Sequence, residues 1–371
     1  MLEIDGSRYS GSGAIVRQAA AYCALTGRAV RVFNARALRP RPGLRPQHLL
    51  VVEAVRELIG GEAAGVHLGS KEFTLRPGRA GVQPPRGYVW DVGSAGSTTA
   101  LALAVLPVLA FAPAPVSVEF RGGLFQDFAP SFFHLEHVVA PLLRRAGIDA
   151  RVEMGRPGYV PRGGGILFLS VKPCAEALRP LVLDEARAAS GVWGIALSSH
   201  LEDRRVSDRM AAAAREVLAA AGYEASIEAR YDASALQPGA ALALFADMGG
   251  GVRMGADRAG APRRSSESVG RQAARELIED LSSGAALDRH AADQVIPFAA
   301  LAAGESRLRV PVITEHIESA AWLAGEFLGA EVRTRDNLVT VSGVGLRPRA
   351  PGAAAGCGLA QPLRSTRRAK P

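Results

Sequence analysis

The sequence predicts a mixed α/β (α+β) fold: a large domain of three similar units, each with two helices and four strands, and a smaller α/β domain inserted before the third unit. Two observations lead to this prediction. The apolar period alternates between that of helices and that of strands, and one order of elements recurs three times. In addition, Gly60, Gly147 and Gly329 each follow the second helix of a unit, where a left-handed cap favours glycine.

Each unit is expected to run from a helix to a strand, then to a second helix and a pair of short strands. The first unit has its helices and strands, in chain order, at 13–27, 29–35, 46–60, 63–70 and 71–78. The second unit has them at 96–112, 116–123, 131–147, 148–155 and 165–173. The third unit has them at 291–305, 306–312, 314–329, 330–336 and 337–343.

The repeat fails between about residues 180 and 283, where the order is strand, helix, strand, strand, helix. We therefore expect the large domain at 1–180 and 284–345 and the inserted domain at 181–283. Residues 346–371 are rich in Pro, Gly and Ala without an apolar period, so a disordered tail is predicted. The tail carries six of the eight net positive charges. Its arginines suit contact with nucleic acid phosphates, and compositional bias is the alternative explanation.

Composition and termini exclude several classes of protein. Three cysteines without motif spacing, Cys23, Cys174 and Cys357, do not indicate a disulfide framework. The first residues turn acidic and polar at once, unlike a signal peptide, so a cytoplasmic location is expected. The apolar run 99–118 is interrupted by three prolines, which favours a buried helix followed by a strand over a membrane span. No membrane partner is predicted.

Candidate phosphate-binding residues gather in the first unit. The loop 34–49 places Arg36, Arg39, Arg41 and Arg45 among four prolines just before a helix. Arginine binds phosphate oxygens in bidentate fashion, and the free N–H groups of the helix start attract anions. A solvated basic loop is the alternative. The Gly/Ser-rich stretches 5–13 and 91–99 also precede helices, but neither has the lysine of a P-loop.

His316 is the candidate nucleophile. It stands at the expected start of the helix 314–329, where the helix dipole favours a neutral imidazole. A neutral imidazole nitrogen is able to attack a phosphorus atom and form a covalent intermediate. A capping or surface histidine is the alternative interpretation. His48 holds almost the same place in the first unit, whereas His67, His134, His137 and His200 have no partner spacing and form no metal motif.

Several of these segments together resemble the RNA 3′-terminal phosphate cyclase family. The likeness extends over nearly all of residues 1–345 and rests on "LEIDGS…GSGAIVR", "RALRPRPGLRPQHL", "VGSAGSTT…LPVL", "GYVPRGGG", "DRHAADQVIPFAALA" and the histidine of "TEHIESA". The resemblance implies an ATP-dependent enzyme that uses a divalent metal, Mg or Mn, and converts an RNA 3′-phosphate into a 2′,3′-cyclic phosphodiester. It also implies the large domain with an inserted smaller domain that the periodicity predicts.

The resemblance further implies a role for individual residues. His316 stands where the family's nucleotidylated histidine stands, so it would take AMP from ATP. The family's positions for the phosphate and the RNA end correspond to Arg17, Arg36, Arg39, Gln47 and His48. Its nucleotide pocket corresponds to Leu103, His290, Ala291, Ala292, Asp293 and Gln294.

The chain departs from the family pattern at several of these places. Ser10 replaces the family's usual glutamate of the first loop, so the metal ligands are unknown. His290 replaces a tyrosine, Leu103 a glutamine, and "GGLFQDF" (122–128) a common "GGTDN" run. A non-catalytic RNA-binding relative, like the ribosome-assembly homologues of eukaryotes, is therefore the competing hypothesis. Transfer onto a carboxyvinyl-type substrate, as in enolpyruvate transferases, is a third. The oligomeric state is not predicted.

Overall fold

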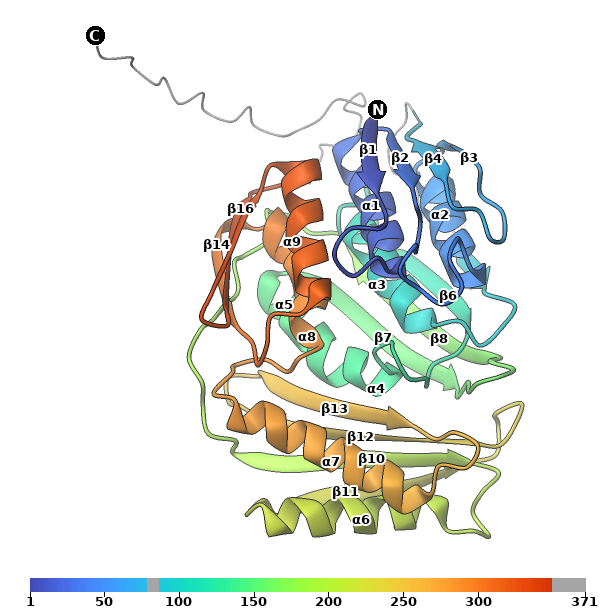
Figure 1. The fold of residues 1–371 in the computed structure, drawn as a ribbon, viewed down its shortest axis with the longest axis vertical. Coiled ribbons are helices and arrows are strands. Elements are labelled where there is room, and N and C mark those ends of the chain that lie inside the picture. Colours follow the sequence, from blue (N-terminus) through green and yellow to red (C-terminus); the bar gives the residue numbers. More distant parts are fainter. Residues whose placement is uncertain (79–86, 349–371) are drawn as a thin grey trace.

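The computed structural model describes residues 1–78 and 87–348, and it has the mixed α/β architecture that the sequence predicts. Within these residues, helices and strands form four sheets of four strands each. Three of the sheets have the same strand order and the same strand directions, with one parallel pair followed by two antiparallel pairs. Their helices pack against one another in the upper part of the molecule, above the fourth sheet (Figure 1).

The first sheet belongs to the N-terminal segment. Its strands lie in the order β1 (Leu2–Asp5), β2 (Val30–Phe33), β4 (Phe73–Arg76) and β3 (Glu62–Ala64). Helices α1 (Gly13–Thr26) and α2 (Pro46–Leu58) connect the strands and pack on each other. Ser12 caps α1 by accepting a hydrogen bond from the amide of Ala14, and the left-handed Gly27 ends the helix. The Ser12 cap fixes the point at which the loop 5–12 meets α1, and Gly27 fixes the other end of the helix.

The second sheet has the order β5 (Tyr88–Asp91), β6 (Val116–Gly122), β8 (Gly165–Lys172) and β7 (Asp149–Arg156). Helix α3 (Thr98–Ala110) is buried along its length and runs into β6, as predicted for the apolar run. The helix expected at 131–147 consists of three pieces, α4 (Phe132–His134), the π-helical η1 (Leu135–Val139) and α5 (Ala140–Ala146). The pieces follow one another without a gap, and Pro141 accounts for the change in hydrogen-bond pattern, since it has no N–H for the carbonyl of His137. That carbonyl accepts from Arg253 instead.

The third sheet combines the C-terminal strands with a distant one. Strands β15 (Glu331–Arg335), β16 (Leu338–Val344) and β14 (Ala303–Arg309) are joined at the edge by β9 (Val182–Leu183), which runs parallel to β14. Helices α8 (Ala291–Leu301) and α9 (Glu315–Leu328) belong to the same segment, and α9 packs on α1. The predicted domain boundaries stay a prediction. Strand β9 lies within the segment 181–283 predicted as the inserted domain, yet it pairs with β14 of the third unit.

The fourth sheet forms a separate layer. Its order is β11 (Ala225–Asp232), β10 (Gly191–Ser199), β12 (Gly239–Asp247) and β13 (Arg253–Ala259), with α6 (Val206–Ala220) and α7 (Ser266–Ser282) packed on each other and on the sheet (Figure 1). The sequence pattern missed β13. Its burial does not alternate, because three consecutive residues are buried, so the strand lacks the period of two that reveals a strand.

One continuous apolar core connects these elements. In the described part of the chain, no helix combines the length and apolarity needed to cross a membrane. Cys23 and Cys174 are buried free thiols. The predicted tail falls mainly on residues outside the described ranges. At the start of the predicted tail, Leu346 is buried and its amide donates to the carbonyl of Leu301. The packed part of the chain therefore includes at least Leu346, one residue beyond the predicted boundary at 345.

Candidate active site

His316 lies in the first turn of α9 and does not cap it. The cap is Thr314, whose hydroxyl accepts a hydrogen bond of 3.2 Å from the amide of Ile317. Burial, together with the positive charges of Arg17, Arg39 and His290, lowers the pKa of His316 to about 4. The ring is therefore neutral at pH 7. Among the described residues, its Nδ1 is buried and has no hydrogen-bond partner, whereas Nε2 is not buried in this way.

Arg17 projects from α1, the helix that packs on α9. Burial lowers the pKa of Arg17 to about 10, with Asp293 raising it and Arg39 lowering it. The guanidinium stays charged at neutral pH despite its desolvation. Arg17 and Arg39, both from the N-terminal part of the chain, thus act on the imidazole of His316 in its C-terminal part. Such a concentration of positive charge is suited to binding phosphate.

The segment 290–294 lies at the start of α8. His290 forms an ion pair with Glu276 at 3.1 Å, and although burial alone would lower its pKa, Glu276 and Asp288 raise the pKa to about 9. Asp293 shows the reverse effect: burial raises its pKa to about 6, against the lowering effects of His290 and Arg17. The amide of Gln294 donates to Asp293 at 2.8 Å. At neutral pH this segment therefore contributes one cation and one carboxylate close to its own pKa.

The basic loop before α2 is only partly directed at the same place. Arg36 has a left-handed backbone (φ 57°) and donates to the carbonyls of Arg41 and Gly43, so it stabilises its own loop. Burial lowers the pKa of Arg36, helped by Arg45 and Arg39. Arg39 is the residue of this loop whose charge acts on both His316 and Arg17.

His48 and Gln47 both connect α2 to neighbouring helices. His48 is buried, and its Nδ1 accepts from the amide of Arg45 at 3.2 Å. A Cβ at Gly13 would lie 2.0 Å from its Nε2, so only glycine permits this approach of α1 to α2. Burial keeps the pKa of His48 well below its ordinary value, and four arginines add to the effect. Gln47 accepts from the amide of Ser97 at 2.8 Å and thereby reaches the start of α3.

Three of the predicted nucleotide-binding residues present only buried apolar side chains. Leu103 lies in the middle of α3 with 8% of its surface exposed, and Ala291 and Ala292 are fully buried in the first turn of α8. Their side chains offer no hydrogen bond. Any contribution they make to a nucleotide site is one of shape.

Ser10 joins the first loop to the helix that carries His316. The Ser319 hydroxyl donates to the carbonyl of Glu315 at 2.8 Å, so it accepts from both the hydroxyl and the amide of Ser10, at 2.8 and 3.2 Å. Ser10 also contacts the Ser12 hydroxyl at 3.0 Å. The residue that replaces the family's glutamate is thus buried in a hydroxyl network that holds the loop on α9.

A buried ion pair escaped the sequence reasoning. His134 Nε2 lies 3.2 Å from both carboxylate oxygens of Asp288, and both side chains are almost completely buried. Asp288 also accepts from the amides of Gly255, His290 and Ala291. This pair joins α4, β13 and the start of α8. No local spacing announces it, since its members are 154 residues apart.

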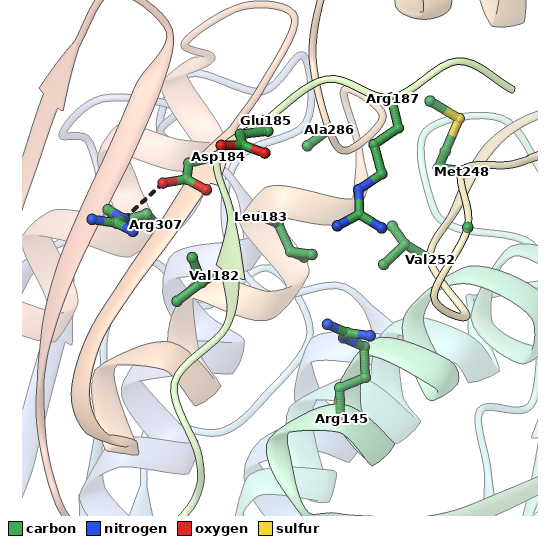
Figure 2. A pocket seen from close by; sticks show the side chains of 11 residues that line it. Arg145, Val182, Leu183, Asp184, Glu185, Arg187, Met248, Val252, Ala286 and Arg307 are labelled. Atoms are coloured by element: carbon green, nitrogen blue, oxygen red, sulfur yellow. Dashed lines mark ion pairs between the residues drawn. The ribbon is translucent and has the colours of Figure 1, made fainter.

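A cavity of about 300 Å³ lies in another part of the molecule, between the end of α5, β9 and the turn from β12 to β13. Figure 2 shows Arg145 and Arg187 pointing toward each other across it and Asp184 paired with Arg307 at 2.8 Å. None of the residues proposed above for His316 chemistry lines this cavity. Within residues 1–78 and 87–348, no cluster of three or more His, Cys, Asp or Glu side chains is placed to hold a metal ion.

A neutral imidazole beside desolvated guanidinium groups is typical of proteins that handle phosphate groups. The model of the family described as RNA 3′-terminal phosphate cyclase matches residues 8–334. The chain belongs to this family. Membership confirms the resemblance given by the sequence motifs, and with it the expected class of ATP-dependent enzyme.

Similar proteins agree over most of their length. A protein from Staphylothermus marinus called RNA 3′-terminal phosphate cyclase is 37% identical over 94% of this chain and 99% of its own. Proteins of the same name from Hyperthermus butylicus and Thermococcus onnurineus are 41% and 38% identical. They cover 85% and 89% of this chain and 88% and 94% of their own.

Proposed function

We propose that this chain converts an RNA 3′-phosphate into a 2′,3′-cyclic phosphodiester, with ATP as the second substrate and His316 as the residue that carries AMP. Family membership supports the overall reaction. The observation that supports the route is the neutral His316, with Nε2 open and with Arg17 and Arg39 acting on it.

In the first step, Nε2 of His316 attacks the α-phosphorus of ATP. A nitrogen–phosphorus bond forms, the bond between the α-phosphorus and its bridging oxygen breaks, and pyrophosphate leaves. The low pKa of His316 keeps the lone pair available at pH 7 without a separate general base. Arg17 and Arg39 stabilise the negative charge that develops on the phosphate oxygens.

In the second step, an oxygen of the RNA 3′-phosphate attacks the same phosphorus and displaces His316. The RNA end then carries AMP through a phosphoanhydride. In the third step, the ribose 2′-hydroxyl attacks the terminal RNA phosphorus and loses its proton to solvent. The phosphoanhydride bond breaks, AMP leaves and the ring closes. The attacking hydroxyl and the phosphorus belong to one nucleotide, so alignment alone supplies much of the rate.

The other predicted residues complete this proposal. His290, Asp293 and Gln294, with the apolar walls of Leu103, Ala291 and Ala292, form the nucleotide side of the site. Arg36, Gln47 and His48 shape the loop that presents Arg39 to the RNA phosphate. Mg or Mn is expected to enter with the ATP phosphates. Such an ion needs only one or two protein carboxylates, and Asp293, whose charge acts on Arg17, is the carboxylate that we propose for it.

The test is incubation with α-labelled ATP and magnesium or manganese, followed by gel analysis. We expect an acid-labile, alkali-stable label on the wild-type chain and none on His316→Ala. The His200→Ala variant is the matched control, because the His200 ring bonds the loop carbonyl of Ala235 and His200 is not among the residues that act on His316. A wild-type chain that stays unlabelled with every metal would support the competing proposal of a non-catalytic RNA-binding relative. Ser10 in place of the family glutamate is the observation behind that alternative.

A further inference from the structure

Two aromatic rings and an arginine form a cluster on the surface beside the first loop. The rings of Tyr9 and Trp322 lie 5.7 Å apart, and the guanidinium carbon of Arg8 lies 4.7 Å from the Trp322 ring and 5.4 Å from the Tyr9 ring. Tyr9 is 39% exposed. Among the described residues, no hydroxyl, carbonyl or carboxylate accepts a hydrogen bond from the Arg8 guanidinium, so its donors remain open to a ligand.

The cluster is held in place by contacts that do not use its exposed faces. Trp322 Nε1 donates to Glu326 at 3.1 Å, one turn further along α9. Tyr9 is fixed by its neighbour Ser10, which bonds to Ser319 on the same helix. The backbone of Tyr9 is left-handed (φ 48°), a conformation that costs energy for any residue other than glycine. The fold therefore holds a large ring where a glycine would be easier to accommodate.

The position of the cluster connects it to His316. Trp322 follows His316 by six residues on α9, which corresponds to about 9 Å along the axis and about a third of a turn around it. Residues 290–294, which we assign to the nucleotide, lie on another helix, α8. A ligand held at His316 therefore needs to extend only about 9 Å along α9 to come level with Trp322.

We propose that Arg8, Tyr9 and Trp322 form a stacking platform for a base near the 3′ end of the RNA substrate. This inference rests on the proposed function. Single-stranded RNA presents unstacked bases and phosphates together, and proteins bind it with aromatic rings beside basic groups. Trp322 supplies the stacking surface, Tyr9 extends it, and Arg8 covers one side while its free donors face a phosphate. Stacking of this kind tolerates any base, so the platform favours a single-stranded end without reading its sequence.

The test compares RNA binding with adenylylation in the full-length protein. Binding of a 3′-phosphorylated oligoribonucleotide is measured without ATP, and labelling of His316 by ATP is measured without RNA. We expect Trp322→Leu to weaken RNA binding about five- to a hundredfold, the effect typical of one lost base stack. Its labelling by ATP stays at the wild-type level. Trp322→Phe restores most of the affinity because it keeps a ring.

A change in the ligand distinguishes stacking from structural support. An oligoribonucleotide whose last three positions lack bases should bind the wild type as weakly as the intact RNA binds Trp322→Leu, and the variant should not distinguish the two RNAs. Phe168→Leu is the control, since Phe168 on strand β8 is an aromatic ring as exposed as that of Tyr9, at 39%. It should bind like the wild type.

Three results would overturn the platform. They are a Trp322→Leu variant that distinguishes intact from abasic RNA as the wild type does, one that loses labelling and RNA binding by the same factor, and one that raises the KM for ATP instead. The first shows that no base stacks there, the second that the ring only supports α9, and the third that adenine is the occupant. If the wild type takes no label at all, the proposed function fails, while the binding comparison still decides the platform.

Discussion

His316 and His134 are the same side chain in two regions that treat it in opposite ways. His316 is surrounded by Arg17, Arg39 and His290, so burial and like charges together lower its pKa to about 4. His134 is more deeply buried, yet the carboxylate of Asp288 outweighs its desolvation and raises its pKa. The surroundings of His316 favour the neutral ring, whereas the carboxylate beside His134 favours the protonated ring.

This difference shows that burial alone does not mark a functional histidine. Asp288 contacts His134 and also accepts from the backbone amides of Gly255, His290 and Ala291, so its charge is compensated within the fold. Three positive groups, Arg17, Arg39 and His290, act on the His316 ring. Their mutual repulsion favours the binding of an anion. We interpret the region of His134 and Asp288 as the anchor of the site and the region of His316 as its reactive end. Each prediction below perturbs one region and uses the other as its reference.

The largest expected effect is on stability, from Asp288→Asn. The substitution keeps the shape of the side chain but removes the charge opposite His134, and breaking a buried ion pair costs about 3–5 kcal/mol. Chemical denaturation of the variant and the wild type gives the difference. Asp149→Asn is the control, because the exposed Asp149–Lys172 pair should contribute less than about 1 kcal/mol. Equal losses in the two variants would mean that the buried pair has no special role.

The next effect is on chemistry, from Arg17→Gln. Loss of one preorganised donor to a developing phosphate charge typically slows a reaction about 10²- to 10³-fold. We expect the rate of His316 labelling by ATP to fall by that order while the free energy of unfolding changes little, since burial already works against the guanidinium. Arg28→Gln is the comparison. Arg28 directly follows the C-terminal cap of α1, the helix that carries Arg17, but it donates to the carbonyls of Glu326 and Phe327 at the C-terminal end of α9. Similar slowing in both variants would remove Arg17 from the site.

Much of the fold follows from local patterns in the sequence, and most of the charge network does not. Apolar periods located the helices, and the caps at Gly147 and Gly329 have the expected left-handed backbone. Strand β13 was missed because its buried residues are consecutive. The helix expected at 131–147 is present from Phe132 to Ala146, but the pattern did not show the π-helical stretch before Pro141. These errors arise where tertiary contacts override a local signal.

The candidate site illustrates the same limit. Family motifs pointed to His316, Arg17 and Arg39, which the fold brings into electrostatic contact. No motif indicated that Ser10 bonds to Ser319 or that His134 meets Asp288, because these partners are 309 and 154 residues apart. A single sequence contains the residue types but not the distances between them, so long-range pairs appear only when the chain is folded.

The opposite pKa shifts of the two histidines predict opposite dependences of stability on pH. The unfolded chain binds more protons at His316 than the folded chain, so this residue lowers stability as the pH falls from 6.5 toward 4, by at most about 1.4 kcal/mol per pH unit. His134 stabilises the fold below pH 6.5, and this contribution is lost as the pH rises through its raised pKa. Denaturation between pH 4.5 and 8.5 tests both.

The variants His316→Ala and His134→Gln separate the two contributions. His316→Ala should gain stability relative to the wild type as the pH is lowered, because it has no imidazole to protonate. The deficit of His134→Gln should be greatest near pH 5 and should shrink toward pH 8.5. Parallel curves for both variants and the wild type would show that neither histidine titrates differently in the folded state.

The smallest expected effect comes from Ser319→Ala, which removes the link between the first loop and α9. Ser319 accepts two hydrogen bonds from Ser10, and the loss of such bonds in a partly enclosed network costs about 1 kcal/mol. The reactive region should feel this change more than the anchor does, because the loop and α9 together hold the surroundings of His316, while the His134–Asp288 pair lies on other elements. We therefore expect faster amide exchange at residues 8–12 with unchanged exchange at Ala291, whose amide donates to Asp288. Faster exchange at Ala291 as well would show that the anchor and the reactive end open as one unit.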